Sequence, residues 1–249
     1  MEKGQVMEFT ELHNHALYAC DDGPKSEKDM QSLIDAIYKD NIRHLCLTPH
    51  YHPGYFGENV ERADRSFDKL LRYVSEKYPD LKLYRGNELR YNRGCVEWIK
   101  AGKCHPINDT NYVLVDFSQS SEGDEIVKGT NSILSAGYIP VLAHVERYRK
   151  VAKNMDFVRE LRENGVIIQV DAQSILGVFG FGSKRSCKRM LSLHLVDAVA
   201  TDAHGSIRRP PSITESYKYI EKHYGKKYAE AVCVYNPYAI LQNRRLGKE

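Results

Sequence analysis

The chain has 249 residues, and its 36 Lys and Arg against 33 Asp and Glu give a formal net charge of +3. This length can bury a full hydrophobic core, and so mild a charge does not predict the strongly basic face of a nucleic-acid binder. The first residues, MEKGQVMEFTEL, lack the apolar core of a signal peptide, and no stretch approaches the roughly 20 apolar residues of a membrane span. We therefore expect a cytoplasmic protein that neither inserts into a membrane nor binds nucleic acid.

Short aliphatic and β-branched runs recur along the chain and predict seven β-strands. In chain order they cover residues 8–12, 44–48, 81–85, 112–117, 139–143, 166–170 and 197–201.

Helical patterns separate these strands. In SEKDMQSLIDAIYKD, residues 26–40, Ser26 can cap the helix, Asp29 completes a capping box, and apolar residues recur with the helical period. Residues 59–78 keep the same period. Further helices are predicted over residues 125–135, 155–163, 184–193, 213–224 and 228–234.

The alternation of strand and helix has no break in composition, no Pro-rich linker and no low-complexity tract. This pattern predicts one parallel-stranded α/β domain that spans residues 1–249. Seven units favour a distorted (β/α) barrel, similar to the TIM barrel but with one unit fewer than the usual eight.

Parallel α/β domains carry their chemistry at the carboxyl ends of the strands, so the residues that follow each strand are informative. Ligand-type side chains follow six of the seven strands, and the sixth strand offers only Asp171. With Asp22 from the first loop, the set is His13, His15, Asp22, His50, Glu88, Asp116, His144, Asp202 and His204.

A set of nine side chains exceeds the three or four that one zinc ion uses, and it is large enough for two or three ions. Imidazole and carboxylate ligands without thiolate favour manganese, iron or zinc over copper or an iron-sulfur cluster. The six cysteines show no C-x-x-C spacing, so we expect reduced packing residues rather than a zinc ribbon. None has an arginine six residues later, which a cysteine phosphatase requires.

Several separated motifs carry a resemblance to a known family. LHNH, TPH, GNE, LAHVERY and ATDAH resemble, in this order, the polymerase and histidinol phosphatase (PHP) superfamily of metal-dependent phosphoesterases. HNHALYACDDGPKS, LTPHYHPGYF, QVDAQSILGVFG and TDAHGSIRRPP are similar, more narrowly, to the bacterial capsule-type protein tyrosine phosphatases. The similarity runs from about Phe9 to Leu241 and includes NPYAIL near the C-terminus.

The resemblance implies a PHP-type barrel of seven units with three metal ions. It assigns His13, His15, Glu88 and Asp202 to one ion, Asp22, His50 and His204 to a second, and Glu88, Asp116 and His144 to a third, with Glu88 bridging. Asp116 departs from the family pattern, which has Glu at that position.

The resemblance also implies an activity. Members of the family act on bacterial tyrosine kinases of capsular and exopolysaccharide synthesis, so we expect a manganese-dependent phosphatase that hydrolyses phosphotyrosine by metal-activated hydroxide, without a phosphoenzyme. Arg147, which follows His144, and Arg208 and Arg209, which follow His204, are the candidates for binding phosphate.

Two alternatives stay open. A related phosphatase could act on histidinol phosphate or another small metabolite through the same metal site. A protein of another class, a metal-stabilised regulator, could bind a kinase without catalysis.

Overall fold

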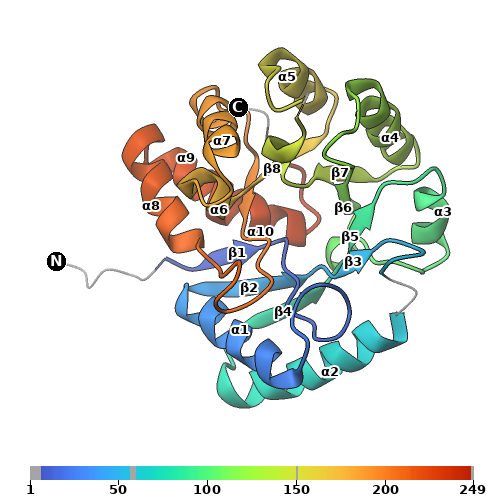
Figure 1. The fold of residues 1–249 in the computed structure, drawn as a ribbon, viewed down its shortest axis with the longest axis vertical. Coiled ribbons are helices and arrows are strands. Elements are labelled where there is room, and N and C mark those ends of the chain that lie inside the picture. Colours follow the sequence, from blue (N-terminus) through green and yellow to red (C-terminus); the bar gives the residue numbers. More distant parts are fainter. Residues whose placement is uncertain (1–6, 57–59, 150, 248–249) are drawn as a thin grey trace.

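Two parallel β-sheets, which together form one curled layer surrounded by helices, lie at the centre of the molecule (Figure 1). The computed structural model describes residues 7–56, 60–149 and 151–247. Its strands are β1 (Phe9–Glu11), β2 (Ile42–Leu47), β3 (His50–Tyr51), β4 (Lys82–Arg85), β5 (Glu88–Arg90), β6 (Tyr112–Asp116), β7 (Ile139–Leu142), β8 (Ile167–Asp171) and β9 (Ala198–Ala200). They pair in the orders β1-β2-β4 and β3-β5-β6-β7-β8-β9, and all of these pairs are parallel.

Two short breaks separate the two sheets. β2 ends at Leu47 and β3 begins at His50, while β4 ends at Arg85 and β5 begins at Glu88. His50 is the register partner of Glu88 in the pair β3–β5, so the two residues lie side by side on neighbouring strands. Pro49 lies in the first break, and its ring supplies no backbone N–H for the ladder.

The segments that follow β1 and β9 close the sheet on itself. Asn14 and Ala203 form an isolated parallel bridge, in which the backbone N–H of His15 donates to the Ala203 carbonyl at 3.0 Å. The backbone N–H of Asp202 donates to the His13 carbonyl at 2.9 Å. The first and last strands therefore meet at their carboxyl ends.

The helices lie outside the sheet (Figure 1). They are α1 (Glu27–Lys39), α2 (Val60–Lys77), α3 (Cys95–Lys100), α4 (Gly123–Ser135), α5 (Met155–Glu163), α6 (Ala172–Leu176), α7 (Phe181–Ser192), α8 (Ile213–Tyr224), α9 (Lys226–Glu230) and α10 (Asn236–Leu241). The predicted N-cap of α1 is confirmed, because Ser26 accepts from the backbone N–H of Asp29. Asp29 pairs with the cap through its carboxylate, which accepts from the Ser26 hydroxyl at 2.7 Å.

The structure confirms the predicted α/β class with a parallel sheet, and all seven predicted strands are present with ends shifted by two residues at most. The extra segments β3 and β5 bring the described strands to nine, where seven were predicted. The predicted helix over residues 228–234 is wrong in detail: α9 ends at Glu230 and a π-helical turn, Ala231–Tyr235, continues into α10. The short helices α3 and α6 were not predicted, since five or six residues carry too little periodicity.

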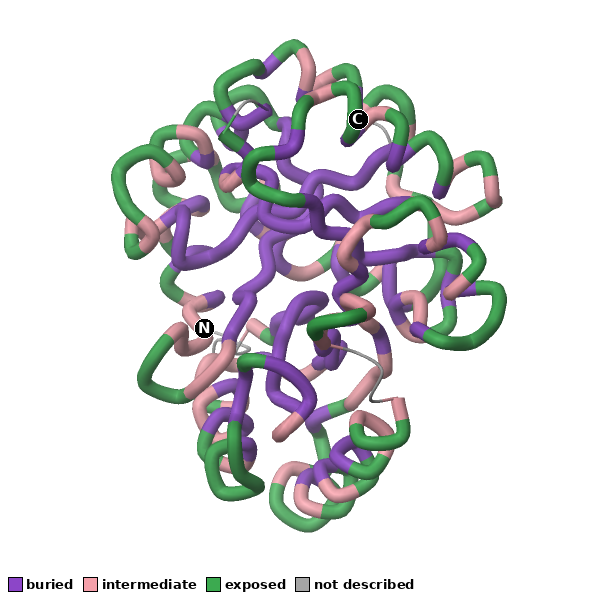
Figure 2. The backbone as a smooth tube through the Cα atoms, turned by 45° about the vertical axis from the view of Figure 1, so that its right-hand side comes forward, coloured by how far each residue is buried: buried purple, intermediate pink, exposed green. Residues whose placement is uncertain are grey.

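The core lies between the sheet and the helices. Figure 2 shows buried backbone along the strands and exposed backbone on the outer helical turns. On α1 the stripe Met30, Leu33, Ile34 and Ile37 is fully buried, as the helical period predicts. Among the described residues, no helix combines the length and the apolar character needed to cross a bilayer.

Candidate metal centre

All nine predicted ligand residues meet at the carboxyl edge of the curled sheet. They come from the segment after β1 (His13, His15), the following loop (Asp22), β3 (His50), β5 (Glu88), the end of β6 (Asp116), and the segments after β7 (His144) and β9 (Asp202, His204). Their donor atoms form four overlapping groups, in each of which the atoms lie within 4.8 Å of one another. The convergence expected from the strand ends is therefore present in the structure.

Glu88 lies at the centre of this cluster and is buried. Its Oε2 atom is 2.6 Å from His50 Nδ1, 3.3 Å from His15 Nε2 and 3.4 Å from His13 Nε2. Its Oε1 atom is 2.9 Å from His144 Nε2. One carboxylate therefore reaches imidazoles from three different strands.

Asp202 faces the same pair of imidazoles from the opposite end of the sheet. Its Oδ1 atom is 3.4 Å from His13 Nε2 and 3.3 Å from His15 Nε2. The two Nε2 atoms are themselves 3.2 Å apart. Two ring nitrogens and two carboxylate oxygens thus converge on one small volume.

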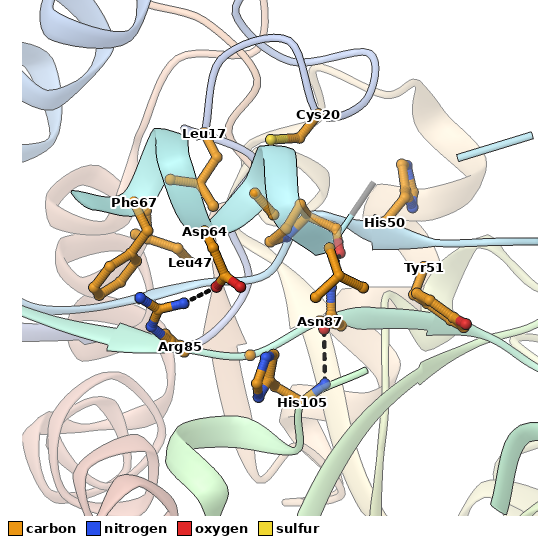
Figure 3. Close-up of a pocket in the computed structure, with 14 residues that line it drawn as sticks. Leu17, Cys20, Leu47, His50, Tyr51, Asp64, Phe67, Arg85, Asn87 and His105 are labelled. Atoms are coloured by element: carbon orange, nitrogen blue, oxygen red, sulfur yellow. Dashed lines mark hydrogen bonds and ion pairs between the residues drawn. The ribbon is translucent and has the colours of Figure 1, made fainter. Parts of the chain in front are cut away.

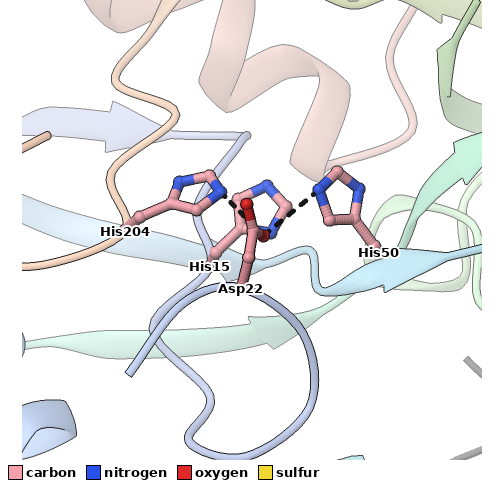
Figure 4. A group of neighbouring side chains, drawn as sticks. All are labelled: His15, Asp22, His50 and His204. Carbon is pink, nitrogen blue, oxygen red and sulfur yellow. Dashed lines mark ion pairs between the residues drawn. The ribbon is translucent and has the colours of Figure 1, made fainter. Parts of the chain in front are cut away.

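A second group lies nearer to solvent and is drawn in Figure 4. Asp22, whose side chain is half exposed, has Oδ1 at 3.4 Å from His50 Nε2 and 3.2 Å from His204 Nε2. The ring of His15 stacks on the ring of His204 with centroids 4.0 Å apart. This group can hold an ion that is open to the solvent on one side.

Asp116 lies at the periphery of the cluster. Its Oδ1 atom is 3.8 Å from His144 Nε2 and accepts from the Tyr148 hydroxyl at 3.2 Å, while its Oδ2 atom is 3.0 Å from Arg90. Burial and the neighbouring Glu88 raise the pKa of the Asp116 carboxyl. Arg90 was not predicted as part of the site, although it lies two residues after Glu88 on the same strand and so points to the same side.

Two of the candidate ligands have an unusual backbone conformation. His144 has φ of 36° and Asp202 has φ of 50°, in the left-handed region that L-residues other than glycine rarely adopt. Such conformations cost on the order of 1–3 kcal/mol each and cluster at functional sites. Their presence at two strand ends indicates that the fold fixes these side chains toward the cluster.

Residues behind the cluster orient the imidazoles, and none of them was predicted to have this role. Asp21 Oδ2 is 2.7 Å from His15 Nδ1, so Nε2 of His15 faces Glu88. Gln169 Oε1 lies 3.3 Å from His13 Nδ1 and accepts from the backbone N–H of His144 at 2.9 Å. Fixing one ring nitrogen by a hydrogen bond leaves the other as the ligand atom. Asp21 follows the H-x-H motif in the same loop, whereas Gln169 on β8 gave no signal.

The three candidate arginines occupy different environments. Arg147 Nη2 is 2.9 Å from Asp202 and also pairs with Asp171, and Arg209 pairs with Asp202. Arg147 and Arg209 line the pocket that contains Glu88 and Asp202, whereas Arg208 is exposed and is not part of its wall.

The carboxylates and imidazoles of the cluster shift one another's pKa values. Burial alone would raise the pKa values of Glu88 and Asp202, but the facing histidines hold both well below their usual range. Burial alone would lower the pKa values of His50 and His144, but Glu88 raises that of His50 to about 10, and Asp116 with Glu88 raises that of His144 to about 9. Without another cation, positive charge is therefore held on His50 and His144.

The donor set fits divalent metal ions. Glu88 Oε2 is buried and has no hydrogen-bond partner among the described residues, although three imidazole nitrogens lie within 3.4 Å. A cation bound between these atoms would satisfy the carboxylate and the ring nitrogens together. Nitrogen and oxygen donors without thiolate suit manganese, iron or zinc.

The described structure offers the six cysteines no catalytic role. All six are buried and free. Burial raises the pKa of every one of these thiols, to about 12 in the case of Cys20 and Cys104. A thiol with a raised pKa is a poor nucleophile at neutral pH.

Two cavities adjoin His50. The metal pocket has a volume of ≈130 Å³ and contains Glu88, Asp202, Arg147 and Arg209 in its wall. The other, drawn in Figure 3, has a volume of only ≈30 Å³ and is lined largely by apolar side chains such as Leu17, Leu47 and Phe67. A space of this size holds one or two water molecules, so the metal pocket is the better candidate for a reaction.

A family model described as "Capsular polysaccharide synthesis, CpsB/CapC" matches residues 9–242. The chain is 30% identical over 239 residues to tyrosine-protein phosphatase CpsB of Streptococcus pneumoniae, a match that covers 94% of this chain and 98% of that protein. It is 28% identical over 237 residues to tyrosine-protein phosphatase YwqE of Bacillus subtilis, which covers 95% and 90% of the two chains.

A solved structure of these proteins has a similar fold. It belongs to a set of crystal structures of YwqE from Bacillus subtilis and CpsB from Streptococcus pneumoniae, which are described as unique metal-dependent tyrosine phosphatases. It superposes with a TM-score of 0.87 at 27% identity, and the match covers 96% of this chain and 97% of that chain.

Proposed function

The chain belongs to the CpsB/CapC family of capsular polysaccharide synthesis, and on this premise we propose that it is a metal-dependent protein tyrosine phosphatase. The observation that carries the proposal is the convergence of five imidazoles and four carboxylates next to a pocket whose wall includes Arg90, Arg147 and Arg209. Under this proposal, residues 1–249 form a single phosphoesterase domain, and the nine strands form seven units, with β2 and β3 in one unit and β4 and β5 in another.

We assign the nine side chains as ligands of two to three divalent ions, with manganese as the resident metal. His13, His15, Glu88 and Asp202 form the first site, Asp22, His50 and His204 the second, and Glu88, Asp116 and His144 the third. The 3.8 Å separation of Asp116 from His144 makes the third site the loosest of the three.

The reaction adds water to a phosphate monoester. The water oxygen bonds to phosphorus, the bond from phosphorus to the tyrosine oxygen breaks, and that oxygen takes up a proton. Bound divalent ions lower the pKa of water and offset the charge of the phosphate dianion, which allows this reaction at neutral pH.

The chain's own residues hold the phosphate in place. Arg147 and Arg209 lie in the pocket wall with Asp202 between them, so their guanidinium groups are fixed before substrate arrives. A planar guanidinium can bind two phosphoryl oxygens at once. Preorganised charge of this kind stabilises a transition state without further rearrangement.

The proposed substrate is a phosphotyrosine protein, a bacterial tyrosine kinase of capsular or exopolysaccharide synthesis. The family description and the names of the relatives support this choice. We propose a cytoplasmic location, which six free, buried thiols support because reduced cysteines are typical of that compartment.

Turnover by the purified protein tests the function. Phosphotyrosine peptide, phosphoserine peptide and histidinol phosphate are compared, each with manganese and with chelator. We expect the phosphotyrosine peptide to be hydrolysed fastest and chelator to abolish turnover, which manganese then restores. Faster hydrolysis of histidinol phosphate would favour a metabolite phosphatase, and metal binding without any turnover would favour a regulator.

A further inference from the structure

A second cavity, the flanking cavity, opens beside the metal pocket. It has a volume of ≈560 Å³ and shares Gln119, Arg147 and Arg209 with the metal pocket. The metal pocket, at ≈130 Å³, is smaller than the roughly 300–1,000 Å³ of typical ligand sites. It can admit a phosphoryl group, but the peptide that carries this group must continue outside, and the shared wall leads into the flanking cavity.

The flanking cavity carries unpaired positive charge. Arg149 and Lys153 line it and are exposed, and neither side chain forms an ion pair or hydrogen bond within the described part of the chain. Arg147 and Arg209 add charge from the shared wall, although both are already paired with Asp202. Glu146 is the single carboxylate in the described lining, and burial together with Asp171 raises its pKa to about 7.

Two further features of the walls suit an acidic peptide side chain. The first turn of α7 contributes Gly182 and Ser183, and Gly180 at its N-cap offers no side-chain acceptor for the free backbone N–H groups. Phe179 forms an apolar wall, with the guanidinium of Arg147 4.5 Å from its ring centroid. Such a wall can pack against the carbon atoms of a neighbouring side chain while the cations bind its charge.

We propose that the flanking cavity binds an acidic side chain of the substrate peptide next to the phosphotyrosine, with Arg149 and Lys153 as the residues that select it. This inference rests on the proposed phosphatase function and adds a substrate class to it.

Three phosphotyrosine peptides that carry Glu, Gln or Lys at the flanking positions test the inference, with free phosphotyrosine as the reference. In the unmodified enzyme we expect kcat/KM to be roughly five- to tenfold higher for the Glu peptide than for the Gln peptide, mainly through KM, and lowest for the Lys peptide. In the double variant Arg149→Ala/Lys153→Ala this preference should disappear, while turnover of free phosphotyrosine stays unchanged.

Arg185→Ala is the matched control, because Arg185 is an exposed cation on α7 that does not line the flanking cavity. It should retain the preference. Equal kcat/KM for all three peptides in the unmodified enzyme, a preference that survives the double variant, or equal loss of free phosphotyrosine turnover in that variant would each overturn the inference. Absence of turnover of free phosphotyrosine and of all three peptides in the unmodified enzyme would instead overturn the proposed function and the inference with it.

Discussion

At the scale of single residues, Glu88 faces four imidazoles of the candidate metal centre, more than any other carboxylate in the described part of the chain. It faces His13, His15 and His50 with one oxygen and His144 with the other. Removing it should therefore affect more than one ion, whereas removing a peripheral carboxylate should affect one.

We expect Glu88→Ala to lose at least about 100-fold in turnover together with bound metal, and Asp116→Ala to lose less of both. Glu88 is within 3.4 Å of four imidazoles, whereas Asp116 is 3.8 Å from one. Metal content by elemental analysis and turnover of phosphotyrosine peptide measure the difference. Glu88→Gln keeps the side-chain volume and controls for packing. Equal metal content and equal rates in the two Ala variants would contradict the grouping.

Arg147 and Arg208 form a natural pair for a second comparison. Arg147 is expected to donate a charge-assisted hydrogen bond to the phosphate in the transition state. Arg147→Ala should then lose about 1.5–3 kcal/mol of transition-state stabilisation, which lowers kcat/KM roughly 10- to 150-fold. Arg147→Lys should recover part of the loss, since a point charge lacks the planar fork. Arg208→Ala is the control, because Arg208 is exposed and outside the pocket wall.

Metal content has to be measured in Arg147→Ala and Arg147→Lys, because Arg147 contacts the candidate ligand Asp202 and its loss could also disturb metal binding. Unchanged kinetics in Arg147→Ala would make this arginine a structural partner of Asp171 and Asp202 rather than a phosphate ligand.

All ligand-type residues except Asp22 were predictable because they lie at or just after the end of a predicted strand, and the carboxyl ends of parallel strands meet at one edge. The residues that orient them were not predictable in the same way. Gln169 lies in the middle of an apolar strand, and nothing in the sequence indicates that it reaches both His13 and His144. Its role depends on which strands become neighbours, which is a property of the closed sheet.

At the scale of elements, the breaks between β2 and β3 and between β4 and β5 set the positions of His50 and Glu88. The runs 44–48 and 81–85 predict where β2 and β4 lie, but the two- and three-residue segments β3 and β5 are too short to show a period. Pairing of His50 with Glu88 depends on these segments. The left-handed φ of His144 and Asp202 was equally hidden, because neither is a residue type that requires it.

Asp40 links two helices that are far apart in the sequence. It ends α1, and its carboxylate accepts from the backbone N–H groups of Ile213 at 2.6 Å and Thr214 at 3.2 Å, at the start of α8. Ser212, the N-cap residue of α8, makes no side-chain capping bond. Asp40 therefore serves as the cap of α8.

Asp40→Ala should lower the free energy of unfolding by about 1–2 kcal/mol, since it leaves first-turn N–H groups without an acceptor. Chemical denaturation at neutral pH measures the change. Asp40→Asn, which keeps one acceptor oxygen, should cost less. Asp156→Ala on α5 is the control, because Asp156 is exposed and its contact with Arg159 is a surface pair worth little. Equal effects of Asp40→Ala and Asp156→Ala would rule out the capping role.

At the scale of the whole molecule, the candidate metal ligands come from both segments that close the sheet. His13 and His15 follow the first strand, Asp202 and His204 follow the last, and the backbone bridge between Asn14 and Ala203 lies among them. Ions held by residues of both segments would reinforce this closure. Stability of the fold should therefore depend on metal, because a folded site binds ions that the unfolded chain binds weakly.

We expect manganese to raise the melting temperature and chelator to lower it. Saturation to 100 times the dissociation constant stabilises by about 2.7 kcal/mol per site, which corresponds to roughly 5–10 °C for a chain of this size. His144→Ala should reduce the rise in melting temperature that manganese causes. His44→Ala should leave it unchanged, since His44 is bonded to the Tyr84 hydroxyl away from the cluster.

The rise in melting temperature caused by manganese should also increase with pH, and the direction of this change follows from the pKa values of the histidines. Facing carboxylates raise the pKa of His50 to about 10 and of His144 to about 9 in the metal-free protein, above the ordinary value of 6.5. The stability that these protons contribute is fully present below pH 6.5 and is lost as pH rises through 9 to 10. Manganese must displace the same protons, so its affinity increases over that range while the metal-free protein weakens. Melting curves recorded with manganese and with chelator at pH 6.5 and at pH 8.5 measure this change. The difference in melting temperature between manganese and chelator should be larger at pH 8.5. A larger difference at pH 6.5 would mean that these imidazoles are not the ligands.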